Sequence, residues 1–412
     1  MANVSSSNGL EKRPKLRFPG FDEPWESKTF DQAFTILPNN TLSRADLRSD
    51  GIVYDIHYGD VLIKFGSILD MGNEEVPYIA NGKEGKTSAQ LQDGDIVIAD
   101  TAEDETAGKA VEIYNAQRKQ IEAGLHTIPC RPISAYAPMY LGYYVNSAFY
   151  HGQLLSLLQG VKVLSISKAN ISKTVITSPR SKTEQEKISS ILYLIDLKVK
   201  KQRQIIDTLK KYKRGLNHKL LSEIAGQYNH ELGTVCSIVG GGTPDTLRPE
   251  YWEGNVEWFT PSEIGKSKYV LSSHRKISQI GLANSSAKML PAGTVLLTTR
   301  ATLGEMSIAR SECSTNQGFQ SLIADSKKVL PEYLYYLQIL IKPWCEKYAS
   351  GNTFREISKA SLSKCLVPIP GLNSQKKIVY ILSHIDDLIE KYECVERFLT
   401  QIKEGLLQQL FI

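Results

Sequence analysis

The stretch EQEKISSILYLIDLKVKKQRQIIDTLKKYKRGLNHKLL, residues 184–221, returns in diverged form as SQKKIVYILSHIDDLIEKYECVERFLTQIKEGLLQQLF, residues 374–411. Thirteen of the 38 aligned positions are identical at a constant offset of 190. The peptide SKANISK (167–173) precedes the first copy, and SKASLSK (358–364), identical at five of seven positions, precedes the second. An internal repeat defines the architecture of a chain. This chain is therefore a tandem duplication in which each variable block is followed by a shared block.

Both shared blocks have the apolar spacing of long helices. In the second block, apolar or aromatic residues alternate at intervals of three and four through four heptads, which is the pattern of a coiled-coil seam. The first block keeps this phase, with polar interruptions at Lys198 and Gln202. The predicted seam consists of Ile188, Ile191, Ile195, Ile205, Leu209, Leu216, Ile378, Ile381, Ile385, Leu388, Val395, Leu399, Ile402 and Leu406.

The two shared blocks differ in charge. Residues 181–221 carry eleven Lys/Arg against four Asp/Glu, whereas residues 373–412 carry five against six. Two long helices with apolar seams and unequal charge can pair with each other. We expect an antiparallel coiled coil with pseudo-twofold symmetry. The alternative is two solvated amphipathic helices that lie separately on globular domains.

The variable blocks have the short strand-like runs of mixed domains. Examples are GDVLIKF (59–65), GDIVIAD (94–100) and AGTVLLTTR (292–300). The predicted fold class is α+β, with two mixed α/β domains in tandem, each followed by a long helix. The expected boundaries are 1–180 for the first domain, 181–225 for the central helix, 226–372 for the second domain and 373–412 for the C-terminal helix.

The composition limits the partners and the cellular location that we expect for the protein. A formal net charge of +5 over 412 residues permits a polyanionic partner without requiring one. No apolar run reaches the ~18 residues of a membrane helix, and the polar N-terminus lacks the apolar core of a signal peptide. We therefore expect a cytoplasmic protein without membrane contact. The six cysteines form no C-x-x-C pair, so we expect no bound metal.

No catalytic motif is recognisable in the sequence. It lacks a phosphate-binding P-loop, a dinucleotide fingerprint, the adenine-methyltransferase signature and a nucleophile elbow. We therefore expect a non-catalytic recognition or scaffolding subunit that binds no cofactor of its own. An unrecognised nuclease or other enzyme would need a spatial carboxylate or histidine cluster that the linear sequence hides.

The second variable block carries an ordered set of motifs. They are GGTP (241–244), EYWEGNVEW (250–258), LLTTR (296–300), NQGF (316–319), SKASLSK (358–364) and PIP (368–370). In this order, before a long terminal helix, they resemble the target-recognition domain of type I restriction–modification specificity subunits. LRFPGF (16–21) also resembles the start of such subunits. The first variable block lacks G-T-P, E-Y-W and N-Q-G-F, so residue roles cannot be transferred to it from the second block.

The resemblance implies a non-catalytic specificity subunit whose two target-recognition domains each read half of a split, asymmetric DNA site. It implies double-stranded DNA, two methyltransferase subunits and, in the full complex, restriction subunits as partners. S-adenosylmethionine would then be bound by the methyltransferase partner, and ATP and Mg by the restriction partner. The methyltransferase partner would flip the target adenines out of the duplex. The alternative function is a duplicated coiled-coil scaffold or adaptor without sequence-specific DNA binding.

Basic, amide and hydroxyl side chains contact phosphates and base edges. In the first block we expect the DNA-binding residues to be Lys64, Lys83, Lys86, Thr101 and Lys109. In the second block we expect Thr243, Arg248, Lys266, Lys268, Arg275, Arg300, Gln317 and Arg355. Arg300 is the strongest candidate because it ends the LLTTR strand at a loop. The alternatives are an exposed polar turn for residues 83–88 and a surface salt bridge for Arg300.

Overall fold

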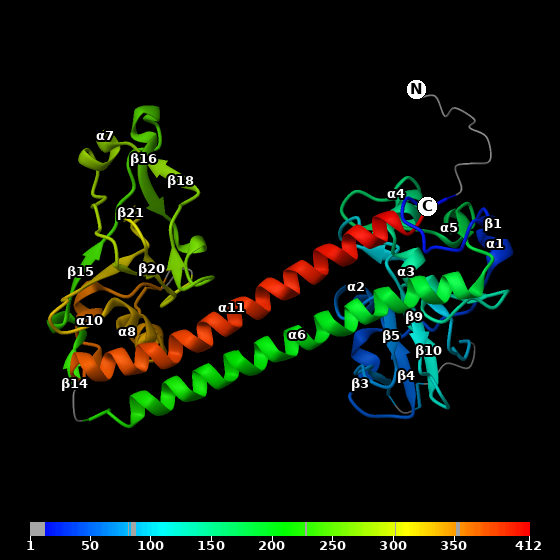
Figure 1. Ribbon diagram of the computed structural model, residues 1–412, viewed down its shortest axis with the longest axis horizontal. Helices are drawn as coiled ribbons and strands as arrows, with labels where there is room; N and C mark the ends of the chain where they lie inside the picture. Colours follow the sequence, from blue (N-terminus) through cyan, green and yellow to red (C-terminus); the bar gives the residue numbers. More distant parts are fainter. Residues whose placement is uncertain (1–12, 81, 84–87, 227–228, 301, 352–354) are drawn as a thin grey trace. The chain divides into compact units, whose positions relative to one another are not determined.

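The computed structural model describes residues 13–80, 82–83, 88–226, 229–300, 302–351 and 355–412. The chain forms two compact units. Unit 1 contains the chain up to Arg203 together with Cys394–Ile412, and unit 2 contains Gln204–Glu393. Two long helices, α6 (Lys182–Ser222) and α11 (Leu372–Gln409), therefore contribute to both units (Figure 1). The prediction that the repeated blocks are long helices is confirmed.

Unit 1 contains two mixed sheets and several short helices. Its strands are β1 (Glu26–Thr29), β2 (Phe34–Ile36), β3 (Leu47–Arg48), β4 (Val53–Ile56), β5 (Ile68–Asp70), β6 (Tyr78–Ile79), β7 (Ile96–Ala99), β8 (Thr101–Ala102), β9 (Ala110–Tyr114), β10 (Gln120–Ala123), β11 (Thr127–Pro132), β12 (Leu164–Ser165) and β13 (Val175–Ser178). Its shorter helices are α1 (Phe30–Ala33), η1 (Arg44–Asp46), α2 (Tyr58–Ile63), α3 (Tyr140–Val145), α4 (Ala148–Leu155) and α5 (Lys168–Ile171). The prediction of a strand at GDVLIKF is wrong, because most of this run lies in α2, whose start is capped by the His57 side chain.

The main sheet of unit 1 has the strand order β2-β11-β7-β9-β5, and the second sheet has the order β10-β4-β6-β3. Four buried tyrosines, Tyr140, Tyr143, Tyr144 and Tyr150, belong to the larger core of unit 1. Phe411 packs edge-on against Tyr140 and Tyr144, each with ring centroids 5.8 Å apart. The end of α11 is therefore part of the core of unit 1.

Unit 2 has a similar plan. Its strands are β14 (Asn229–Glu231), β15 (Cys236–Gly240), β16 (Trp252–Phe259), β17 (Tyr269–Val270), β18 (Arg275–Ile277), β19 (Val295–Leu297), β20 (Met306–Ala309), β21 (Cys313–Thr315), β22 (Gln320–Ala324) and β23 (Leu366–Pro368). Its shorter helices are η2 (Leu232–Thr234), η3 (Pro249–Tyr251), η4 (Pro261–Glu263), α7 (Gln279–Ala283), α8 (Pro331–Tyr336), α9 (Gln338–Tyr348) and α10 (Lys359–Ser363). A five-stranded sheet, β15-β22-β19-β20-β17, adjoins a three-stranded sheet, β18-β16-β21.

The repeated SKA peptide begins a one-turn helix in each unit. The Ser167 hydroxyl accepts a hydrogen bond from the Asn170 amide at 3.2 Å, which caps α5. The Ser358 hydroxyl accepts one from the Ser361 amide at 3.1 Å, which caps α10. A serine at this position satisfies one of the free amides at a helix start. The peptide therefore recurs because both units need the same cap before the strand that leads into a long helix.

The apolar row that the two long helices bury shares Ile188, Ile195, Ile378 and Ile385 with the predicted seam and departs from it at the positions between them. Leu209 and Leu216 of the predicted seam also pack in the cluster between the helices in unit 2. In α6 the buried row runs through Ile188, Leu192, Ile195, Val199 and Ile206, and in α11 through Ile378, Leu382, Ile385 and Ile389. Of the predicted seam, Ile381, Leu388, Val395 and Ile402 are exposed, and Ile191 and Ile205 are only partly buried.

From Ile188, the next buried residues follow after four and then three positions, at Leu192 and Ile195. In the predicted seam they follow after three and then four positions, at Ile191 and Ile195. The buried row of α6 contains Val199 and not Lys198. Gln202 is the polar residue at the next position of this row.

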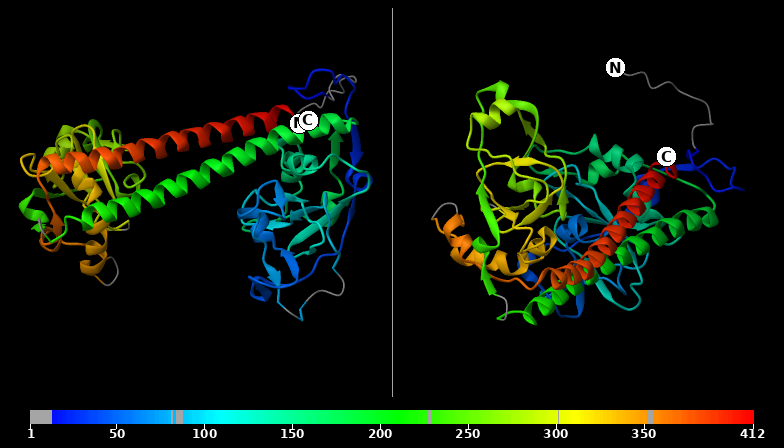
Figure 2. Two further views of the ribbon diagram at one scale, coloured as in Figure 1. Left: turned by 60° about the horizontal axis from the view of Figure 1, so that its bottom comes forward. Right: turned by 60° about the vertical axis from the view of Figure 1, so that its left-hand side comes forward.

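Within each unit the two long helices also contact each other. In unit 2, Ile206 of α6 packs with Ile385 and Ile389 of α11, and these segments lie side by side in both views of Figure 2. In unit 1, Arg203 Nη2 lies 2.8 Å from Glu396 Oε1. Among the described residues, no helix is both long enough and apolar enough to cross a membrane.

Candidate nucleic-acid interface

Two turns that are far apart in the sequence pack directly on each other in unit 2. The Thr243 hydroxyl donates a hydrogen bond to the side-chain oxygen of Gln317. The Gly242 amide donates to the Thr315 carbonyl at 2.9 Å. Trp258 Nε1 donates to the Gly242 carbonyl at 2.9 Å. The GGTP and NQGF motifs therefore meet at one place.

The glycines of the GGTP motif allow this close approach. A Cβ at Gly241 would overlap with the carbonyl oxygen of Asn316, and a Cβ at Gly242 would overlap with the backbone of Ser286 and Ala287. Backbone cannot move aside as the end of a flexible side chain can. Glycine is the residue that permits such contact between backbones.

A tryptophan–arginine stack lies next to this junction. Trp252 and Trp258 both lie on β16, whose register shifts between Trp252 and Val256. Their rings meet edge to face with centroids 5.1 Å apart. The Arg275 guanidinium lies 3.7 Å from the Trp252 ring centroid, in cation–π contact. Trp258 is buried, so it packs against the inner side of the Trp252 ring.

Arg300 joins the same junction through the backbone. The Thr299 amide donates to the Gly318 carbonyl at 2.8 Å, which places Arg300 beside the NQGF turn. Arg300 Nε and Nη2 lie 2.9 and 2.8 Å from one carboxylate oxygen of Glu356. The surface ion pair considered as an alternative role for Arg300 is therefore present, and the Arg300 side chain is 42% exposed.

The other residues predicted in the second block take varied positions. Arg248 lies 3.4 Å from Glu250, and Arg355 donates to the Glu346 carbonyl. Lys266 is exposed and has no hydrogen bond or ion pair with another described residue. Lys268 points inward, with Nζ 2.8 Å from the Tyr336 hydroxyl, and burial lowers its pKa. The structure thus brings Thr243, Arg275, Arg300 and Gln317 into one connected region and places Lys268 elsewhere.

Most of the residues predicted in the first block form hydrogen bonds or ion pairs with other groups of unit 1. Lys109 Nζ donates to the carbonyls of Leu62 and Phe65 at 2.8 and 3.1 Å, at the end of α2, and burial lowers its pKa. A lysine there satisfies the free carbonyls of a helix C-terminus. The remaining contacts are Lys64 with the Glu75 carbonyl, Lys83 with Asp46, and Thr101 with Asp100. Lys86 lies outside the described residues.

The sequence did not predict the tryptophan–arginine stack formed by Trp252 and Arg275. Arg275 was predicted as a DNA-binding residue, but its stacking on Trp252 was not predicted. Pairing of β16 with β18, which sets Trp258 opposite Arg275, is a tertiary fact.

Comparison with known proteins gives matches at three levels. Residues 228–395 match the model of the type I restriction modification DNA specificity domain. The Type I restriction enzyme MjaIX specificity subunit of Methanocaldococcus jannaschii is 35% identical over 182 residues, which are 43% of this chain and 42% of that protein. The MjaX specificity subunit of the same organism is 24% identical over 92% of this chain and 91% of its own length.

A solved structure shares the fold. The type-I restriction-modification system S subunit from M. genitalium superposes with a TM-score of 0.57 at 16% identity, covering 97% of this chain and 99% of that one. The matched part of this chain spans less than half of the MjaIX subunit, whereas the likeness to MjaX and to the M. genitalium subunit runs along nearly the whole chain.

The chain thus has two mixed sheet-and-helix units that share two repeated helices. Residues 228–395, which match the DNA specificity domain, lie mostly in unit 2. The chain is therefore similar in sequence to specificity subunits of type I restriction enzymes, and it shares the fold of a solved S subunit.

Proposed function

We propose that this chain is the non-catalytic subunit that gives a type I restriction–modification complex its DNA sequence specificity. Each unit would read one half of a bipartite, asymmetric site. The observation that carries the proposal is the junction in unit 2, where Thr243, Gln317, Arg300 and the Arg275–Trp252 stack come together from separate segments. Amide, hydroxyl and guanidinium groups are the side chains that discriminate base edges in a groove.

The long helices are proposed to pair as an antiparallel coiled coil with pseudo-twofold symmetry. Packing of Ile206 with Ile385 and Ile389 supports this in unit 2. The ion pair of Lys210 with Glu393, at 2.7 Å, supports it from the charged side of the same helices. The basic first block and the slightly acidic second block complement each other in such a pair.

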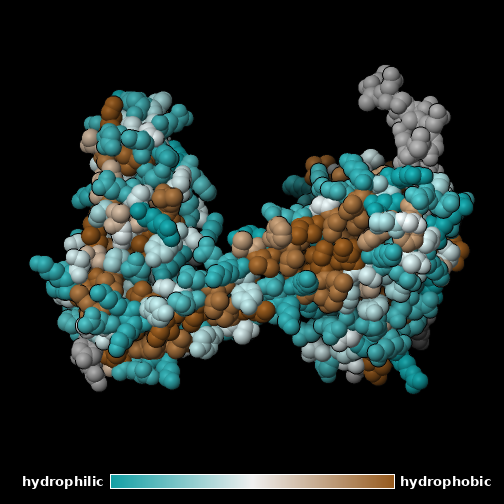
Figure 3. All heavy atoms as spheres, in the orientation of Figure 1, coloured by the Kyte–Doolittle hydropathy of each residue, from teal (hydrophilic) through white to brown (hydrophobic). Residues whose placement is uncertain are grey.

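Two methyltransferase subunits are proposed to dock on the repeated helices. Apolar residues gather along the last part of α11 in Figure 3, where Val395, Phe398 and Ile402 are exposed. Exposed apolar patches of this kind mark interaction surfaces. S-adenosylmethionine would belong to the methyltransferase partner, and ATP and Mg to the restriction partner. The complex would act in the cytoplasm, on double-stranded DNA.

The test is a map of adenine methylation across the host genome by long-read sequencing. Deletion of this chain should abolish methylation at one split, asymmetric motif, and the wild-type chain should restore it. Gln317→Ala should restore it poorly and with relaxed preference in one half-site only. A complex of wild-type chain and methyltransferase that assembles but shows no sequence preference in DNA binding would favour the alternative, a scaffold or adaptor.

A further inference from the structure

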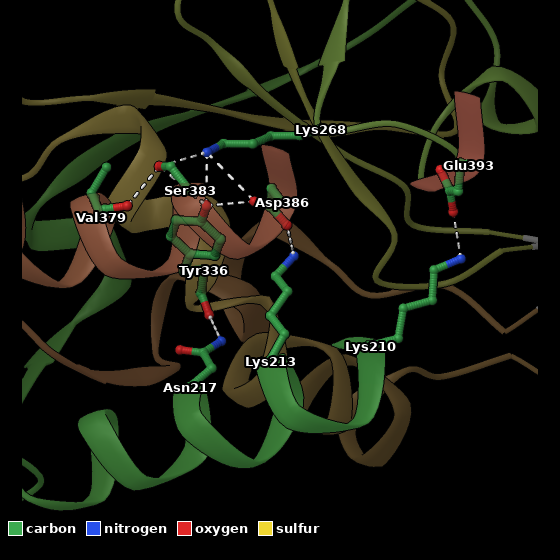
Figure 4. Close-up of polar contacts among 9 residues, drawn as sticks. All are labelled: Lys210, Lys213, Asn217, Lys268, Tyr336, Val379, Ser383, Asp386 and Glu393. Carbon is green, nitrogen blue, oxygen red and sulfur yellow. Dashed lines mark hydrogen bonds and ion pairs between the residues drawn. The ribbon is translucent and has the colours of Figure 1, made fainter. Parts of the chain in front are cut away.

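A compact polar cluster joins the two long helices in unit 2 (Figure 4). Asp386 of α11 accepts a hydrogen bond from the Tyr336 hydroxyl of α8 at 2.5 Å and forms an ion pair with Lys213 of α6. Lys268 Nζ lies 2.8 Å from the same hydroxyl and 3.7 Å from the Asp386 carboxylate. None of these charged side chains is more than 23% exposed. The Asp386 carboxylate thus links α11 to α6 and to α8 of the domain.

The same cluster occurs in unit 1 with the two helices exchanged. Here Asp196 of α6 accepts a hydrogen bond from the Tyr143 hydroxyl of α3 at 2.8 Å. Lys403 of α11 donates to Asp196 at 2.6 Å. Lys403 Nζ lies 5.4 Å from the Tyr143 ring centroid, and Lys213 Nζ lies 5.4 Å from the Tyr336 ring centroid. Even the position of the lysine over the tyrosine ring is therefore repeated.

The sequence repeat accounts for this exchange. Asp196 and Asp386 are identical partners in the repeat, and so are Lys213 and Lys403. On each helix the aspartate precedes the lysine by 17 residues. In an antiparallel pair, equal spacing on both helices lets a single register satisfy both clusters at once.

An apolar row alone specifies register weakly. Hydrophobic contact is non-directional, and a row of Ile and Leu at heptad spacing packs almost as well after a slip of one heptad. Buried polar groups are the best-attested means of choosing one register in paired helices. A slip of one heptad in one direction would set Asp196 against Glu396, and a slip in the other direction would set Arg203 against Lys403. Each slip also separates Asp196 from Lys403 and Asp386 from Lys213, so neither slipped register satisfies the two clusters.

We propose that the Tyr143–Asp196–Lys403 and Tyr336–Asp386–Lys213 clusters fix the axial register of α6 against α11, and so act as positioning residues for the spacer length of the recognised DNA site. The register does not depend on DNA binding, whereas the spacer consequence rests on the proposed function. Both helices run through both units, so a change of register would change the number of unspecified bases between the half-sites.

The test uses the full chain with spin labels on cysteines introduced at Lys198 and Gln401, exposed positions of α6 and α11 within unit 1. Cys394 is replaced by serine, because it is exposed and the other cysteines are buried. Lys403→Asp should lose the wild-type distance, with a shift of about 10 Å for a slip of one heptad. The charge exchange Asp196→Lys with Lys403→Asp should restore the wild-type distance. The matched control is Lys391→Asp, an exposed charge reversal on α11, which should leave the distance unchanged.

An unchanged distance in Lys403→Asp would overturn the proposal, and so would an exchange variant that folds without recovering the wild-type distance. The exchange variant also covers the case in which the single variant does not fold. Methylation mapping with the same variants then tests the DNA consequence. Altered spacer length in Lys403→Asp, restored by the exchange, is the expected result. A shifted distance with an unchanged motif would reject the spacer role alone, and absence of any motif with the wild-type chain would reject the proposed function and not the register.

Discussion

The side chain of Gln375, in the first turn of α11, accepts a hydrogen bond from the backbone amide of Leu330 at 2.9 Å. Its amide donates to the carbonyls of Lys328 and Pro370 at 2.7 and 2.8 Å. Gln185 does the same at the start of α6, where it accepts from the Ala137 amide at 2.8 Å. The repeat has kept a glutamine that binds the start of each long helix to its own domain.

Replacement of Gln375 by alanine should lower the free energy of unfolding of unit 2 by about 1–3 kcal/mol, because three backbone groups lose the hydrogen bonds that the buried Gln375 side chain makes to them. Urea unfolding followed by tryptophan fluorescence measures the change, since all tryptophans but Trp25 lie in unit 2. Gln401→Ala, at an exposed position of α11, is the matched control and should be close to neutral. Equal effects of the two substitutions would contradict the anchoring role.

Two glycine-to-alanine substitutions should have opposite signs. Gly241→Ala should destabilise unit 2 by more than about 1 kcal/mol and weaken DNA binding, because its Cβ would overlap with the Asn316 carbonyl. Gly405→Ala lies within α11 with open space around its Cβ, so it should stabilise the chain by roughly 0.5–1 kcal/mol through lower backbone entropy of the unfolded state. Thermal unfolding of both variants decides the point, and the same sign for both would refute it.

Arg300→Ala should weaken specific DNA binding by about 1–3 kcal/mol and relax preference in the half-site read by unit 2. The measurement is a binding titration of the assembled methyltransferase complex on cognate and half-site-substituted duplexes at fixed salt. Lys327→Ala removes an exposed positive charge from a turn of the same unit and serves as control. A uniform loss across all duplexes would instead assign Arg300 to a phosphate contact.

Stability should depend on pH through Asp55 of unit 1. Its carboxylate is buried, and burial raises its pKa to about 7 despite a hydrogen bond from Asn40 at 2.8 Å. Because the folded pKa is raised, the stabilising contribution is fully present below the unfolded value near 3.8 and is lost as pH rises towards 7. Asp55→Asn should therefore flatten the fall in melting temperature between pH 4 and 7. Asp50→Asn, at an exposed position, should keep the wild-type slope.

The phase of the helix contact can be tested at two adjacent isoleucines. Ile206 is buried against Ile385 and Ile389, so Ile206→Ala should cost about 2–5 kcal/mol of unfolding free energy. Ile205→Ala should cost clearly less, because Ile205 is only partly buried. Chemical denaturation of the two variants compares them directly. A larger loss for Ile205→Ala would show that Ile205, and not Ile206, is the main contact of α6 with α11.

The sequence by itself determined the duplication, the two long helices and the order of motifs in the second block. These features are local or repetitive. An identical residue 190 positions away and an apolar residue every three or four positions can be read along the chain. The family resemblance rested on the same kind of local pattern, and the comparisons agree with it.

The tertiary structure alone decided the choices between equivalent local patterns. From Ile188 or Ile378, the residues three and four positions on are both apolar, so only packing against the domain could select Leu192 and Leu382. Similarly, a lysine carries the same charge wherever it lies, and only the fold shows that Lys268 meets Tyr336 inside unit 2. Asp196 binds the Lys403 side chain, which is 207 positions away in the sequence. Such pairings depend on which surfaces the folded chain brings together, and a linear pattern does not encode that choice.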